Sequence, residues 1–163
     1  MRPNDELTAF TDGHAQTVLA WVRSREELEA WASRTDFPLE PSVFAQWHAD
    51  PDVHPYVFEE NGELRAYGEV WEDAEEGEAE LGRIIVAPEA RGRGVGRRFA
   101  GMLAEEAVRR GFDEVWLRIL PTNAPALACY RAAGFRRASP EEEARWNHGQ
   151  PRTYVWMRLL RSA

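Results

Sequence analysis

The sequence has no lysine, so arginine accounts for all 20 basic residues among its 163, and it has one cysteine, Cys129. One cysteine cannot form a disulfide within the chain, which fits a reducing compartment. No apolar run approaches the roughly 18–20 residues of a membrane-spanning helix. Residues 1–6 lack the apolar segment of a signal peptide. We therefore expect a cytoplasmic protein with no membrane partner.

Positive charge is scarce as well, because 28 acidic residues outweigh the 20 basic ones and give a net charge of −8. A surface that binds nucleic acid needs a basic footprint, so we expect no nucleic-acid partner. The missing lysine also excludes the ATP-binding loop in which Gly-Lys precedes Ser or Thr. The length fits one domain over residues 1–163, which is large enough to hold its core without a disulfide or a metal.

The first fifty residues predict short helices. One helix would follow Thr11 and reach about Ala20, and a third would run over residues 41–48. Between them, residues 24–27 form a capping box, Ser-Arg-Glu-Glu, in which the serine and the last glutamate satisfy each other's backbone N–H groups. The helix that this box opens should end before Pro38.

The rest of the chain alternates between strand and helix patterns. Asn61-Gly62 predicts a tight hairpin between two strands, because this pair suits a type I′ turn. A later strand–helix–strand step should be a right-handed parallel crossover. The fold class is therefore α+β, with a mixed antiparallel and parallel sheet of about six to seven strands flanked by helices. The strands are expected at 56–59, 64–71, 79–86, 114–120, from 135 onward and at 154–160, and the helices at 94–110 and 124–133.

A glycine-rich segment, Arg91-Gly92-Arg93-Gly94-Val95-Gly96-Arg97-Arg98, connects an apolar strand to the helix over residues 94–110. Glycines allow the backbone to approach a ligand closely. The free N–H groups and the dipole at a helix N-terminus favour an anion. The four arginines add positive charge to the same place, so the segment predicts a pyrophosphate site.

Two motifs carry a resemblance to a known family. The spacing Arg91-x-x-Gly94-x-Gly96, after a Val-x-Pro-x-x-Arg lead-in, resembles the acetyl-CoA signature of the GNAT superfamily of N-acetyltransferases. Residues 123–135, Asn-Ala-Pro-Ala-Leu-Ala-Cys-Tyr-Arg-Ala-Ala-Gly-Phe, resemble its second hallmark. The likeness is good over residues 56–160 and looser before them.

This resemblance implies the GNAT fold, acetyl-CoA as acyl donor and no metal. It places the acetyl-CoA-binding core at residues 79–135 and the acceptor side at the helical residues 1–50. Backbone groups of the strand before the loop would bind the pantetheine arm, and successive loop amides would bind the pyrophosphate. The implied cofactor-binding residues are Ile84, Ile85, Val86, Arg91, Gly92, Arg93, Gly94, Val95, Gly96, Arg97, Asn123 and Tyr130.

The resemblance also implies catalytic roles. Tyr130 matches the tyrosine that is held to protonate the leaving CoA thiolate, although it could instead only pack against the pantetheine arm. Glu80 matches the position of a catalytic glutamate in some members, and Glu69 on the preceding strand is a second candidate for the general base. Either could instead be an ordinary solvated carboxylate, with a chain of water molecules moving the proton.

Two functions follow from these residues. The first is an acetyl-CoA-dependent N-acetyltransferase, in which a small-molecule or peptide amine attacks the thioester directly in a ternary complex. The alternative is a non-catalytic acyl-CoA-binding or sensing module of the same fold. Homodimers are common in the superfamily, so the resemblance allows a homodimer here, for which the sequence offers no independent evidence.

Overall fold

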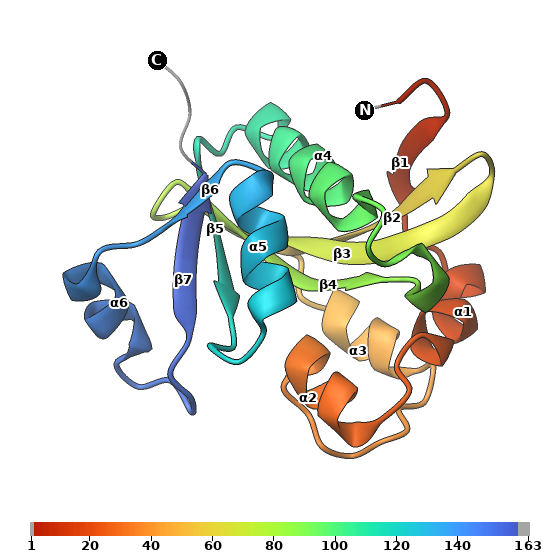
Figure 1. Cartoon of the computed structure of the whole chain (residues 1–163), viewed down its shortest axis with the longest axis horizontal. Helices are drawn as coiled ribbons and strands as arrows, with labels where there is room; N and C mark the ends of the chain where they lie inside the picture. Colours follow the sequence, from red (N-terminus) through yellow and green to blue (C-terminus); the bar gives the residue numbers. More distant parts are fainter. Residues whose placement is uncertain (1, 160–163) are drawn as a thin grey trace.

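A sheet of seven strands, in the order β1-β2-β3-β4-β5-β7-β6, forms the centre of the computed structural model, which describes residues 2–159 (Figure 1). All neighbouring strands are antiparallel except β4 and β5, which run parallel, so the expected mixed sheet is confirmed. The strands are β1 Asp5–Ala9, β2 Val53–Glu60, β3 Glu63–Asp73, β4 Glu78–Val86, β5 Glu114–Ile119, β6 Phe135–Arg137 and β7 Val155–Leu159.

Helices cover both faces of the sheet. The longest, α4, packs on β3, β4 and β5, whereas α2 packs on β4 and α3 on β2. Neighbouring residues of β3 show that these are opposite faces, because Gly68 lies against Phe99 of α4 while Tyr67 makes an edge-to-face contact with Phe44 of α3. The helices are α1 Ala15–Ala20, α2 Arg25–Ala32, α3 Val43–His48, α4 Val95–Arg109, α5 Ala124–Ala132 and α6 Pro140–Asn147, with short 3₁₀ turns η1 Asp12–His14 and η2 Pro88–Ala90.

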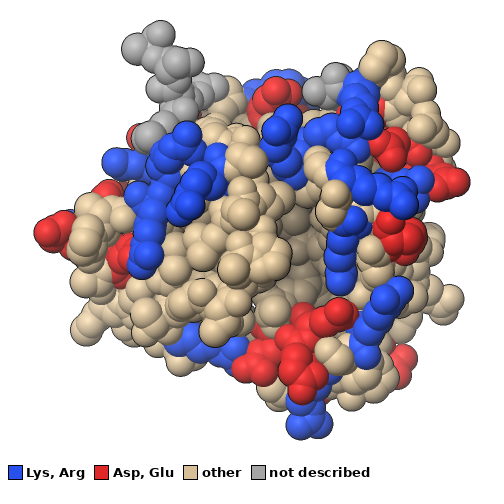
Figure 2. All heavy atoms as spheres, in the orientation of Figure 1, with Lys and Arg blue, Asp and Glu red and all other residues tan. Residues whose placement is uncertain are grey.

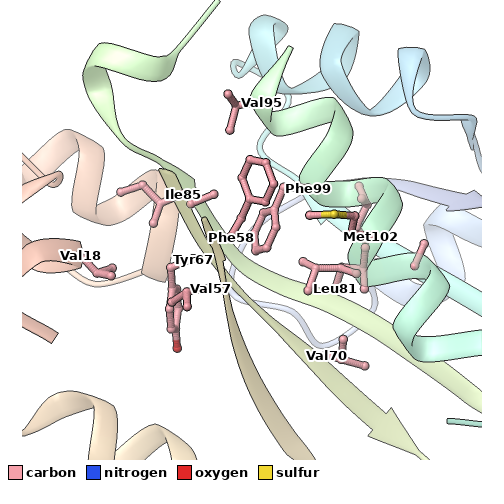
Figure 3. Packing of buried hydrophobic residues seen from close by; sticks show 14 of the residues in the cluster. Val18, Val57, Phe58, Tyr67, Val70, Leu81, Ile85, Val95, Phe99 and Met102 are labelled. Carbon is pink, nitrogen blue, oxygen red and sulfur yellow. The ribbon is translucent and has the colours of Figure 1, made fainter. Parts of the chain in front are cut away.

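The core on the α4 face is made of fully buried side chains. Phe58 of β2 and Phe99 of α4 stack with their ring centroids 6.1 Å apart, and Met102 lies beside them (Figure 3). Glycine at position 68 lets α4 come this close, because a Cβ there would lie 2.9 Å from both Phe99 and Leu103. This packing fixes α4, and with it the loop at its N-terminus, against the middle of the sheet.

The hairpin between β2 and β3 is confirmed. Asn61 and Gly62 have φ values of 53° and 78°, the two positive angles that a type I′ turn requires. The helix after Ser24 is confirmed as α2, with the Ser24 hydroxyl accepting a hydrogen bond from the Glu27 amide. The other half of the predicted capping box is wrong, because the Glu27 carboxylate accepts from the Arg23 amide over 2.7 Å and not from the Ser24 amide. Of the strand expected over residues 154–160, the structure shows β7 as far as Leu159, and residue 160 lies outside the described residues.

Two elements differ from the expectation. The first fifty residues are not wholly helical, since residues 5–9 form β1 at the edge of the sheet, where the buried Asp5 pairs with Arg98 of α4. Between β6 and β7 the chain forms α6, which begins at a capping box of Ser139 and Glu142. Strand β1 is too short and too acidic to show an apolar alternation, so tertiary contacts determine it.

Candidate active site

The parallel strands β4 and β5 separate along their length. They pair only from Glu78–Glu114 to Glu80–Trp116, although β4 continues to Val86 and β5 to Ile119. A cavity of about 300 Å³ lies where they separate. Residues from α2, β4, β5, α5 and the segment before β7 line it, among them Trp31, Glu80, Arg83, Arg118, Tyr130 and Tyr154.

A bulge in β4 accompanies this separation. Tyr67 pairs with Ile85 but Glu69 pairs with Gly82, so β4 has one residue more than β3 in this stretch. The bulge contains Arg83, whose φ of 47° is unusual for a residue with a side chain. Its carbonyl accepts a 2.7 Å hydrogen bond from Nε1 of Trp31 on α2. Since a bulge bends its strand, residues 84–86 are turned from β5, and their backbone groups on that edge are available to a ligand.

The glycine loop has the geometry of an anion site. Gly92 and Gly94 have φ values of 77° and 78°, and Gly94 is the N-cap of α4. No side chain caps this helix, so the amides of its first turn are left for a ligand. No atom lies within 4 Å of a Cβ built on either glycine, which shows open space beside the loop. These features fit the pyrophosphate of acetyl-CoA.

The loop arginines separate into two groups. Arg93 and Arg97 are exposed, while Arg91 folds back so that its Nε donates to the Val86 carbonyl over 3.1 Å. Arg98 does not contribute to the site as expected, because it is drawn to the acidic β1–β2 edge, where it bonds to Asp5 and Glu60. Figure 2 shows this face hollowed beside α5, with arginine side chains above and beside the hollow and acidic ones below it.

Helix α5 brings Tyr130 to the cavity. The Asn123 side chain caps this helix by accepting a 3.3 Å hydrogen bond from the Ala126 amide. Tyr130 is partly buried, and within residues 2–159 its hydroxyl has no hydrogen-bond partner. Burial raises its pKa above the ordinary value, so the phenol is protonated at neutral pH, as a proton donor must be.

Glu80 lies at the cavity beside Arg118 of β5. Nε and Nη2 of Arg118 donate to the two carboxylate oxygens of Glu80 over 2.7 and 3.2 Å. The remaining nitrogen, Nη1, donates to the side-chain oxygen of Gln150 over 3.0 Å. Burial raises the pKa of Glu80 above its ordinary value, and the charge and hydrogen bonds of Arg118 only partly oppose this. A carboxylate with a raised pKa, held in place and in contact with a cavity, has the properties of a general base.

Glu69 has a different environment. Its side chain is fully buried and accepts hydrogen bonds from Tyr67, from Trp71 over 2.7 Å and from Arg83 over 2.5 Å, with His48 at 3.7 Å. Burial alone would raise the pKa of Glu69, but these donors outweigh it and hold the pKa below its ordinary value. Glu69 is not one of the residues that line the cavity.

Residues 2–159 contain neither a cluster of metal ligands nor a membrane-spanning helix. No group of three His, Cys, Asp or Glu side chains in this range could hold a metal ion. None of the helices in the same range combines the length and the apolar character needed to cross a bilayer.

Comparison with known proteins identifies the family. Residues 16–135 match the family model described as acetyltransferase (GNAT) family. The chain belongs to this family. The resemblance that the two motifs carry is thereby confirmed, together with the expected class of acetyl-CoA-dependent N-acetyltransferase.

Curated relatives of this chain are named for several different acetyltransferase activities. IAA acetyltransferase of Azospirillum brasilense is 33% identical over 123 residues, which are 74% of this chain and 80% of that protein. The [ribosomal protein bS18]-alanine N-acetyltransferase of Escherichia coli (strain K12) is 30% identical over 63% of this chain and 68% of its own length. Mycothiol acetyltransferase of Clavibacter michiganensis is 34% identical over 66% of this chain, but the chain spans only 34% of that protein.

Solved structures share the fold. The aminoglycoside acetyltransferase AAC(6')-Ib in complex with ribostamycin and coenzyme A superimposes with a TM-score of 0.76 at 20% identity, covering 97% of this chain and 94% of that one. Spermidine N-acetyltransferase of Vibrio cholerae, in complex with CoA and spermine, gives a TM-score of 0.72 at 18% identity, covering 96% and 94%. At such identities the likeness shows a common fold and leaves the acceptor open.

Sequence reasoning missed Arg83 and Arg118, the two arginines that line the cavity. Arg118 is the only charged residue in the otherwise apolar run Val115 to Leu120, and that was a usable signal. The parallel register places Glu80 opposite Trp116, two residues before Arg118, so both charged groups lie on one face. Arg83 could not have been found in this way, because the bulge changes which face its side chain takes.

Proposed function

We propose that this N-acetyltransferase acetylates the primary amine of a small molecule or a peptide by direct attack in a ternary complex. The observation that carries this proposal is the cavity between β4 and β5. Tyr130 and Asn123, which are expected to contact acetyl-CoA, line it together with the carboxylate of Glu80 and the guanidinium of Arg118. An amine placed there lies between a proton acceptor and a proton donor.

The chain's own residues would hold acetyl-CoA at three places. The open amides at the start of α4, with Gly92 and Gly94, suit the pyrophosphate. Arg93 and Arg97 are exposed beside it and suit the phosphates. The free edge of residues 84–86 supplies backbone groups for the pantetheine arm and for the acetyl carbonyl, where fixed dipoles stabilise developing negative charge.

Glu80 is the proposed base. The acceptor amine must lose a proton before its nitrogen can attack, and Glu80 can take this proton directly or through water. Bound acetyl-CoA supplies the carbonyl carbon to which the nitrogen bonds while the carbon–sulfur bond breaks. Glu69 is the weaker candidate, because its hydrogen bonds favour the charged form and it does not line the cavity.

Tyr130 is the proposed acid. The thiolate that leaves with CoA takes a proton, and the Tyr130 hydroxyl is free of other hydrogen bonds among the described residues. The reaction then balances. The ammonium nitrogen loses one proton to Glu80 before it attacks and a second proton to solvent as the amide forms, the thiolate takes one proton from Tyr130, and exchange with solvent restores both side chains. The products are the amide and CoA with its free thiol.

The test is the release of CoA thiol from acetyl-CoA in the presence of a panel of primary amines. An amine that releases CoA supports the proposal, and Glu80→Gln should then lower kcat by about 100-fold or more. Glu105→Gln, which changes an exposed carboxylate on α4, is the matched control and should leave the rate unchanged. Tight binding of acetyl-CoA with no release from any amine would instead favour the non-catalytic acyl-CoA-binding module.

A further inference from the structure

Arg83 is held rigidly beside the cavity. Its Nη1 donates to Glu69 over 2.5 Å, and its guanidinium carbon lies 4.2 Å from the ring centroid of Trp47 and 5.1 Å from that of Trp71. Its backbone carbonyl accepts a hydrogen bond from Nε1 of Trp31. A group that is immobilised in advance loses little conformational entropy when it binds a ligand.

One edge of this guanidinium is unused. Nε and Nη2 of Arg83 have no hydrogen-bond partner in the described part of the chain. Neither nitrogen is among the buried side-chain atoms that lack a partner, so both are accessible to solvent. The side chain is 21% exposed, and Arg83 lines the cavity. These two N–H groups therefore face accessible space, in the planar arrangement that matches a carboxylate.

The charged residues that line the cavity itself favour an anion at this position. The charged residues of its lining are Glu80, Arg83 and Arg118, that is, one carboxylate and two guanidinium groups. Arg118 already binds both oxygens of Glu80. A polyamine carries two or more positive charges, and the described lining has no free carboxylate to pair with the additional ones. Binding a polyamine here would therefore bury unpaired positive charge.

We propose that Arg83 binds a carboxylate of the acceptor, so that the acceptor is an amine bearing a carboxylate, as a free amino acid is, and not a polyamine. This inference rests on the proposed function and names its substrate class. Glu80 and Arg83 are three residues apart on one strand, at most about 10 Å along the chain. A small amino acid can therefore direct its amine toward Glu80 and its carboxylate toward Arg83.

The first experiment uses the unmodified protein and matched acceptors. Release of CoA is measured with each of the common amino acids, with the corresponding α-carboxamide, and with spermidine. We expect kcat/KM to be about 10- to 100-fold higher for the acid than for its amide, the effect of one charge-assisted pair. Equal rates, faster amides, or a preference for spermidine would overturn the assignment while leaving the N-acetyltransferase proposal intact. No release from any amine would defeat both.

The second experiment tests Arg83 itself. In Arg83→Gln the ratio of kcat/KM between acid and amide should fall to near one, because the carboxylate partner is gone. The ratio is taken within each variant, so a loss of folded protein does not affect it. Arg83→Lys keeps the charge but loses the planar fork and should give an intermediate ratio. Arg109→Gln, at an exposed position of α4, is the control and should keep the full ratio. An unchanged ratio in Arg83→Gln would overturn the assignment.

Discussion

The contact between α4 and α5 can be tested at Gly96, in the first turn of α4. A Cβ at this position would lie 2.9 Å from Sγ of Cys129 on α5, well inside the usual contact distance. Such overpacking costs about 1–3 kcal/mol. Alanine gains up to ~1 kcal/mol over glycine as a helix former. Gly96→Ala should therefore lower the free energy of unfolding by up to ~2 kcal/mol.

Gly101 provides the matched control in the same helix. No atom lies within 4 Å of a Cβ built there, so Gly101→Ala should raise the free energy of unfolding by roughly 0.5–1 kcal/mol. Cys129→Ala removes the sulfur that the new methyl group meets, and Gly96→Ala should be neutral or stabilising in that background. Urea unfolding of the unmodified protein, Gly96→Ala, Cys129→Ala and the double variant measures the coupling, and Gly101→Ala is measured beside them. If Gly96→Ala were as stabilising as Gly101→Ala, the close approach of α4 and α5 would be refuted.

The other predictions concern the three candidate catalytic side chains. Tyr130→Phe should lower kcat by about 100-fold or more, because the proton donor is lost, and should leave the Kd for acetyl-CoA within about twofold. Single-turnover rates measure the first effect, and titration of the variant with acetyl-CoA measures the second. Because the pKa of Glu80 is raised, kcat/KM should fall as the pH drops through a value above 4.5, and a pH profile of Glu80→Gln should lack that limb. The pKa of Glu69 is lower in the folded protein than in the unfolded chain, where it is about 4.3. The charged carboxylate therefore stabilises the fold fully above the unfolded pKa, and this stabilisation is lost as the pH falls through the folded pKa. Urea unfolding should show Glu69→Gln costing about 3 kcal/mol at pH 7 and less at pH 3.5.

Much of the fold could be predicted because local signals and tertiary structure agree. The Asn61-Gly62 turn, the N-cap at Ser24 and the glycine loop each encode a backbone shape in the residues themselves. Strand β1 is different, since its register with β2 and the pairing of Asp5 with Arg98 depend on residues 47 to 93 positions away. The α6 capping box, Ser139 to Glu142, was visible in the sequence, but the expectation of two adjacent final strands concealed it.

The candidate site was predictable to the extent that motifs describe it. The loop, Asn123 and Tyr130 belong to segments whose spacing carries the family resemblance, and the structure brings the loop and α5 together through Gly96 and Cys129. The arginines of the cavity belong to no motif. Arg118 reaches Glu80 only through the parallel register of β4 and β5, and Arg83 reaches the cavity only through a bulge. Long-range pairing and irregular backbone are the two features that one sequence does not encode locally.

The two carboxylate–arginine pairs show how one kind of interaction can serve two purposes. Glu69 and Glu80 lie on neighbouring strands, and each binds an arginine that lines the cavity. Glu69 is fully buried and receives donors from several side chains, so its charged form is favoured and its loss leaves Arg83 without a partner. Glu80 is 20% exposed and has one arginine, and burial brings its pKa toward the range where a proton can be taken up and released. A group that must change its charge during a reaction needs the second environment and not the first, so we assign Glu80 to proton transfer and Glu69 to fixing Arg83.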